Sequence, residues 1–154
     1  MMVEMKKLHY FKEFIEQEEY PLGKNLYMMA LAVEAYYEFV AEVLIPGTSR
    51  SMTQFKLLEE LRALKVIDEQ EFVIMNETRK LKNELTHRLD YEVDIKVVYD
   101  FCNNCMVKDK IVPENKEDQA QLDAALLDGL LKSYKIVDLK LYSKVRKELE
   151  KVHA

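Results

Sequence analysis

A basic residue, an amide and a histidine lie close together in the segment that follows Thr78. Lys82 is followed directly by Asn83, and His87 comes four residues later, so Asn83 and His87 share one face of a helix. Arg79 lies four residues before Asn83 on the same stripe. Such a group could hold a phosphodiester through its cation and amide, and move a proton through the imidazole. The competing interpretation is an ordinary helix face that is exposed to solvent.

The same segment is basic within a chain that is acidic overall. The formal net charge is −5 at pH 7, which argues against broad, nonspecific coating of nucleic acid. A local site for RNA phosphates is still compatible with the sequence, because basic side chains cluster here: Arg79, Lys80, Lys82 and Arg88. We expect Arg79 and Arg88 to be the phosphate contacts outside the central group of three.

The sequence predicts neither a metal site nor a cofactor site. Cys102 and Cys105 are the only cysteines, and their spacing is that of half a zinc site or of a redox pair. A tetrahedral zinc site would need a second ligand pair, which the sequence lacks. A glycine-rich phosphate loop is also absent. Two ordinary core thiols are therefore the favoured interpretation, with a metal or disulfide role as the alternative.

Composition points to a single helical domain spanning residues 1–154. Glycine and proline occur three times each, whereas Leu, Glu, Lys, Ala and Met are plentiful, which favours helices. No apolar run approaches the roughly 18–20 residues that span a membrane, and the charged start lacks the apolar core of a signal peptide. We therefore expect a cytoplasmic protein without membrane contact.

Apolar periodicity predicts an all-α, up-and-down bundle of about five to seven helices. The core should cover about residues 24–105, with C-terminal helices between 117 and 152 packed on it. A short strand is the competing prediction for the β-branched start of the fifth helix. The expected helices are 4–19, 24–44, 52–64, 69–89, 95–106, 117–132 and 139–152.

Local signals fix some helix starts and single out the second helix. Ser49 or Ser51 can cap the third helix, Asp68 forms a capping box with Glu71, and Asp94 can cap the fifth. The second helix is apolar around most of its girth, which suits the middle of a bundle or a dimer interface. Its one polar stripe consists of Glu34, Glu38 and Glu42.

The segment from Phe55 to Asp68, followed by Lys82-Asn83-Glu84-Leu85-Thr86-His87, resembles the HEPN superfamily, including its mannitol operon repressor group. The resemblance covers roughly residues 24–105. Its signature is an arginine, often followed by asparagine, and a histidine four to six residues further on, at the end of a long helix. Lys82 occupies the arginine position here, and lysine cannot provide the planar, two-pronged grip of arginine on phosphate.

The resemblance implies a small dimeric helical bundle. In active members, two protomers bring their motifs together and cleave RNA without a metal. Carried over, His87 would be the general acid and base, Lys82 the phosphate contact, and Asn83 the residue that orients either one.

The resemblance leaves two functions open. One is a noncatalytic or weakly active regulator or interaction protein of a bacterial or phage stress, defence or toxin–antitoxin system. The other is a metal-independent endoribonuclease of the toxin type. Lys82 and the acidic net charge favour the first, and Asn83 with His87 favours the second. The expected partners are a second copy of the chain, a protein such as an antitoxin or regulator, and RNA.

Overall fold

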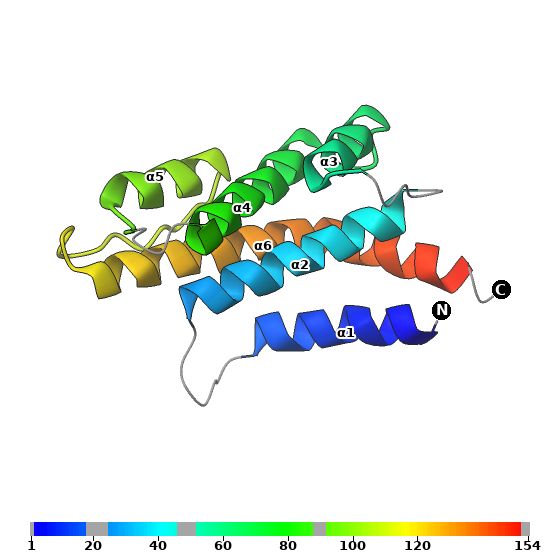
Figure 1. Ribbon diagram of the computed structural model, residues 1–154, viewed down its shortest axis with the longest axis horizontal. Helices are drawn as coiled ribbons and strands as arrows, with labels where there is room; N and C mark the ends of the chain where they lie inside the picture. Colours follow the sequence, from blue (N-terminus) through cyan, green and yellow to red (C-terminus); the bar gives the residue numbers. More distant parts are fainter. Residues whose placement is uncertain (1, 18–24, 46–51, 88–91, 152–154) are drawn as a thin grey trace.

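The computed structural model describes residues 2–17, 25–45, 52–87 and 92–151. These residues form six α-helices and no strand, as the all-α prediction requires. Figure 1 shows α2 and α6 in the middle, α1 along one side, and α3, α4 and α5 on the other. The helices are α1 (Met2–Glu16), α2 (Leu26–Leu44), α3 (Gln54–Ala63), α4 (Glu69–His87), α5 (Ile95–Asn104) and α6 (Gln119–Lys151).

Helix α2 is the central helix of the bundle. It packs against α1, α3, α4 and α6, so neighbours within the chain cover most of its girth. Its buried apolar residues therefore belong to the core and do not form a free dimer surface. The sequence left two interpretations of this apolar helix, a place in the middle of the bundle or a dimer interface. The first is confirmed, and the apolar character of α2 is therefore no longer an argument for a dimer.

Helix α6 is a single helix of 33 residues, so the prediction of two helices separated near residues 133–138 was wrong. Ser133, Tyr134 and Val137, which lie in the expected gap, are weak helix formers taken singly. All three are buried against the bundle, and this packing outweighs their weak preference. The Ser133 hydroxyl also donates a hydrogen bond of 2.8 Å to the Leu130 carbonyl, so this buried polar group has a partner within the helix.

The helix starts follow local capping. The Asp68 and Glu71 backbone N–H groups donate to each other's side chains, at 2.8 and 2.7 Å, which completes the predicted capping box of α4. Asp94 accepts from the Val97 N–H at 2.9 Å and begins α5, which is a helix and not the alternative strand. Thr53 caps α3, whereas the expected caps Ser49 and Ser51 lie outside the described residues.

A buried polar network holds α1 on the bundle. Asp138 of α6 accepts hydrogen bonds from the Tyr36 hydroxyl of α2, at 2.7 Å, and from the Lys12 ammonium of α1. The Tyr134 hydroxyl of α6 donates to Glu16 at the end of α1, at 3.2 Å. These bonds join three helices and fix which face of α1 turns inward.

Cys102 and Cys105 are buried free thiols. Burial raises the pKa of both thiols above the ordinary value of a cysteine. Gly129 of α6 lies against Cys102, where a β-carbon would come within 2.6 Å of the sulfur. A glycine is therefore what lets α5 approach α6 this closely.

Among the described helices, none is long and apolar enough to cross a membrane.

Candidate functional site

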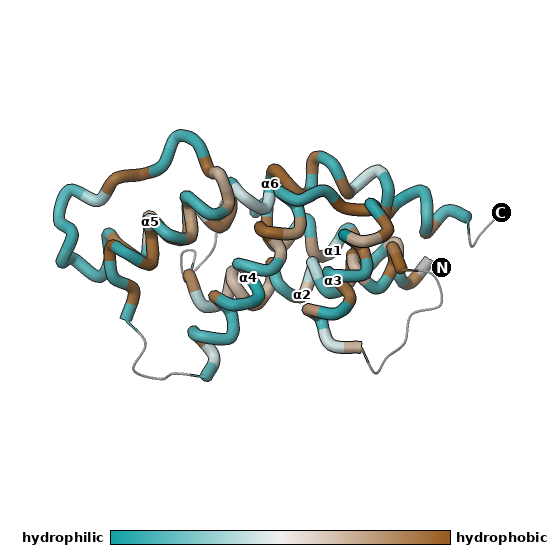
Figure 2. Tube along the Cα trace, turned by 90° about the horizontal axis from the view of Figure 1, so that it is seen from above, coloured by the Kyte–Doolittle hydropathy of each residue, from teal (hydrophilic) through white to brown (hydrophobic). Residues whose placement is uncertain are grey.

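The predicted site residues lie in the last two turns of α4. Lys82 and Asn83 are half-buried, and His87 is the exposed final residue of the helix. The helix places Asn83 one turn before His87 on the same stripe. Figure 2 shows that this end of α4 is mostly hydrophilic. The predicted phosphate contact Arg88 lies outside the described residues.

His87 has the accessibility that proton transfer to a bound substrate requires. Within the described ranges, its imidazole has no hydrogen-bond partner, and Lys82 has no ion pair. The nearest bond in the group is local, from the Thr86 hydroxyl to the Asn83 carbonyl at 3.3 Å. The imidazole of His87 is exposed and the Lys82 side chain is half-buried, and their roles in RNA cleavage stay predictions.

Arg79 is held by its neighbours. Its Nε and Nη2 atoms donate to the Asn76 side-chain oxygen at 3.1 and 3.0 Å, and its guanidinium lies 5.3 Å from the centre of the Phe55 ring. These contacts direct the cation toward α3 and the start of α4. Arg79 would have to leave them to replace Lys82 at a phosphate, so Lys82 is the better-placed cation.

A buried acid lies beside this basic stripe. Glu34 of α2 is 0% exposed, and neither carboxyl oxygen has a hydrogen-bond partner among the described residues. Burial, reinforced by the negative charge of Glu38, raises its pKa to about 8, while the cations of Lys82 and Arg79 oppose the rise. Near neutral pH, the protonated and charged forms of Glu34 are therefore close in free energy.

Glu34 was missed by the sequence analysis, which assigned it to a polar stripe with Glu38 and Glu42. In the structure the stripe runs from buried to exposed: Glu34 is buried, Glu38 half-buried and Glu42 exposed. The only signal in the sequence was an acid within an otherwise apolar helix. Its presence gives Lys82 a second role, since the ammonium also acts as a counter-charge to this carboxyl group.

A second charged cluster surrounds the link between α3 and α4. Lys140 of α6 forms an ion pair with Asp68 at 2.9 Å, and the Lys144 ammonium donates to the Val66 carbonyl at 2.8 Å. Arg62 pairs with Glu69 at 3.3 Å and lies over the Phe72 ring. Lys140 and Lys144 thus fasten the link to α6, and Arg62 joins α3 to α4. These partners indicate a structural role for the cluster.

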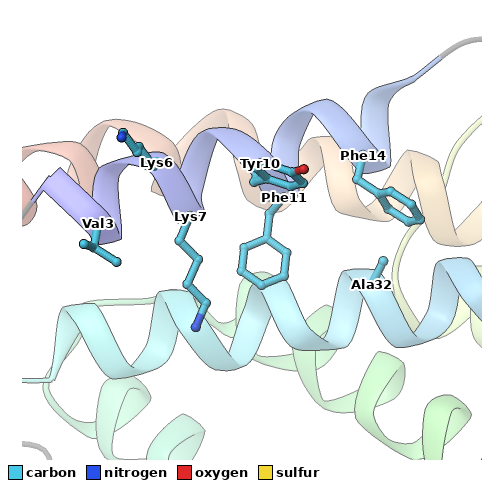
Figure 3. Close-up of a pocket in the computed structure, with 7 residues that line it drawn as sticks. All are labelled: Val3, Lys6, Lys7, Tyr10, Phe11, Phe14 and Ala32. Carbon is cyan, nitrogen blue, oxygen red and sulfur yellow. The ribbon is translucent and has the colours of Figure 1, made fainter.

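An apolar groove of about 460 Å³ lies along α1 beside α2. Figure 3 shows Lys7 and Phe11 reaching from α1 toward α2. Val3 and Tyr10 are 72% and 76% exposed, which is high for large apolar side chains. The groove residues are Val3, Lys6, Lys7, Tyr10, Phe11, Phe14 and Ala32.

The described residues contain no group of three or more His, Cys, Asp and Glu side chains placed to hold a metal ion. Comparisons with known protein families, with curated proteins and with solved structures found no match. The structure therefore shows an all-α protein of six helices within the described ranges, and the HEPN resemblance stays a prediction from the motif in α4.

Proposed function

We propose that this chain is a HEPN-like regulator or interaction protein with weak or absent ribonuclease activity. It would act through protein contacts in a bacterial or phage stress, defence or toxin–antitoxin system. The observation that carries the proposal is the apolar groove along α1, which includes the exposed side chains of Val3 and Tyr10. Contiguous apolar surface of this kind is typical of protein interaction sites.

Three features of α4 support weak catalysis. The position of the family's arginine holds Lys82, which offers phosphate a point charge in place of a planar donor pair. The nearest arginine of the helix, Arg79, is occupied by Asn76 and Phe55. The Lys82 cation also interacts electrostatically with the buried carboxyl group of Glu34, so part of its effect is spent within the protein.

The alternative is a metal-independent endoribonuclease that uses Lys82, Asn83 and His87. The exposed imidazole of His87, one turn from Asn83, favours it. In that mechanism His87 would take the proton of the ribose 2′-hydroxyl or give one to the leaving oxygen. Lys82 would neutralise the phosphate, and Asn83 would orient either group.

Incubation of the purified chain with total RNA in EDTA distinguishes the two functions. The proposal predicts no cleavage, or slow cleavage, by the wild-type chain. Rapid cleavage that is unaffected by EDTA and disappears in His87→Ala would overturn the proposal in favour of the endoribonuclease. A general acid or base contributes about 100- to 10,000-fold, so the loss would be plain. Equal cleavage by the wild-type chain and His87→Ala indicates a contaminating nuclease. Both preparations are then purified further until this background cleavage is removed, and the comparison is repeated.

A further inference from the structure

The apolar groove along α1 is bordered by cations. Lys6 and Lys7 are the charged residues of its lining, which among the described residues includes no acid. Neither ammonium has an ion pair within the described part of the chain. Glu13 lines a separate hollow of about 330 Å³ beyond Tyr10. The groove is therefore apolar along its lining and positive at the end that contains Val3.

The two lysines lie on opposite sides of the apolar lining. Figure 3 shows Lys7 reaching from α1 toward α2 and Lys6 pointing away from α2. The Lys7 ammonium lies 5.3 Å from the centre of the Phe39 ring of α2, which holds it at that edge of the groove. Both side chains are exposed, so each ammonium can still meet an anionic group of a bound molecule.

The length and spacing of the groove suit a helix. Its lining on α1 runs from Val3 to Phe14, which is about 16 Å along the helix axis, or three turns. Val3 and Tyr10, which are 72% and 76% exposed, are two turns apart. A second helix that lies along α1 repeats its side chains at the same pitch, so apolar residues on successive turns can contact the groove.

We propose that the groove binds an amphipathic helix of a partner protein, in which acidic residues flank the apolar stripe on both sides. This inference rests on the proposed function and names the chemistry of the partner. The apolar stripe would pack on Val3, Tyr10 and Phe14. Carboxylates on its two flanks would meet Lys6 and Lys7. Charge complementarity of this kind favours an acidic partner over a basic one.

The arrangement favours a helix over an anionic membrane surface. Recognition of anionic lipids by charge uses clusters of roughly four to eight basic residues, whereas two lysines border this groove. The net charge of −5 also opposes binding to a negative surface. Among the described helices, α1 packs only against α2 and α6, and Figure 1 shows it along one side of the bundle, where a partner helix can approach.

Fluorescence anisotropy with two labelled synthetic peptides tests the proposal. Both peptides have about 18 residues, which is long enough for a helix, and the same leucine stripe. Glutamates flank the stripe in one peptide, and lysines replace them in the other. A groove of this length buries less than the roughly 800 Å² per partner of a standard interface, so the glutamate peptide should bind with a Kd on the order of 10 μM. The lysine peptide should bind at least about tenfold more weakly.

Variants of the groove should change this preference. Lys6→Glu/Lys7→Glu should reverse it, so that the lysine peptide binds more tightly than the glutamate peptide. Tyr10→Ala should weaken binding of the glutamate peptide about tenfold. Lys135→Glu/Lys147→Glu is the matched control: it changes the net charge equally, and both residues are exposed on α6 and do not line the groove. Circular dichroism of each variant shows whether the bundle is folded.

Several results would overturn the proposal. They are no binding of either peptide, equal binding of both, or a preference that the variant Lys6→Glu/Lys7→Glu leaves unchanged. Binding to phosphatidylserine vesicles that needs Lys6 and Lys7, without peptide binding, would assign the groove to a lipid surface. Self-association by light scattering that Tyr10→Ala abolishes and the glutamate peptide does not displace would assign it to a second copy.

The peptide assay and the RNA assay fail separately. RNA cleavage that depends on His87 would overturn the proposed function and leave the binding of the glutamate peptide intact. Absence of peptide binding together with absence of RNA cleavage would overturn the acidic helix as the partner and leave a noncatalytic protein that acts through other contacts.

Discussion

The Tyr36 hydroxyl of α2 donates a hydrogen bond of 2.7 Å to Asp138 Oδ1 in the middle of α6. The other oxygen of the same carboxylate accepts from Lys12 of α1. Tyr36 is fully buried, and its burial together with the Asp138 charge raises its pKa, so it stays a donor. This carboxylate is thus the point at which α1 is attached to the two central helices.

Removal of the Tyr36 hydroxyl should destabilise the bundle. In Tyr36→Phe the ring stays in place, but Asp138 loses a donor in a largely buried position, which costs about 1–3 kcal/mol. Urea unfolding followed by circular dichroism measures the change. Tyr99→Phe on α5 is the matched control, because Tyr99 is half-buried and its hydroxyl has no hydrogen bond among the described residues. Equal losses in the two variants would contradict the role of Asp138.

The contact between Gly129 and Cys102 should couple the two residues energetically. Alanine favours a helix over glycine by about 1 kcal/mol, yet a β-carbon here meets the Cys102 sulfur at 2.6 Å, and overpacking costs about 1–3 kcal/mol. We therefore expect Gly129→Ala to destabilise the wild-type chain but to be neutral or stabilising in a Cys102→Ala background. Thermal unfolding of the four chains measures this coupling. Strictly additive effects would show that the contact has no energetic importance.

Glu34 should make the stability of the protein fall as pH rises. Its folded-state pKa is raised from 4.5 to about 8, so between these values the folded chain retains a proton that the unfolded chain releases. The stabilising effect of this proton is complete below pH 4.5 and is lost as the pH rises through about 8. The slope is at most about 1.4 kcal/mol per pH unit.

Comparison with Glu34→Gln isolates this effect. The amide keeps the shape of the side chain and cannot titrate, so the difference in unfolding free energy should shift toward the variant between about pH 5 and pH 8. Glu71, whose pKa is also raised by burial, contributes equally to both chains and cancels. A constant difference across that range would mean that Glu34 is charged throughout.

The α4 motif predicts a specific pattern of RNA cleavage if the chain has residual activity. Lys82→Arg should increase cleavage, because a planar donor pair replaces a point charge at the phosphate. Arg79→Ala should mainly lower stability, since this side chain is held by Asn76 and Phe55. Gel assays of RNA in EDTA, paired with unfolding curves, separate the two effects. Cleavage that falls in Lys82→Arg, or that collapses only in Arg79→Ala, would contradict the assigned roles.

The helices could be predicted where their signals are local. Asp68 and Glu71 satisfy each other within one turn, so the start of α4 could be identified from the sequence. The continuity of α6 through Tyr134 depends on contacts with helices that are distant in the sequence. The helix propensities of the neighbouring residues do not reflect these contacts. Glu34 shows the same limit: its spacing from Glu38 suggested a solvated stripe, and only the packing around α2 decides which acid is buried.

The exposure of Tyr10 was not predicted, because the sequence pattern of α1 is that of an ordinary amphipathic helix. The structure shows that α2 and α6 cover only part of α1, which leaves Tyr10 76% exposed. This coverage depends on the arrangement of three helices and is absent from the sequence of α1 alone.

Cleavage of RNA in EDTA tests most directly whether the motif of α4 supports catalysis. The wild-type chain is compared with His87→Ala, which lacks the imidazole. The predicted result is little or no cleavage by the wild-type chain, because Lys82 offers the phosphate a point charge in place of a planar donor pair. Rapid cleavage by the wild-type chain that persists in EDTA and is lost in His87→Ala would contradict the proposed function.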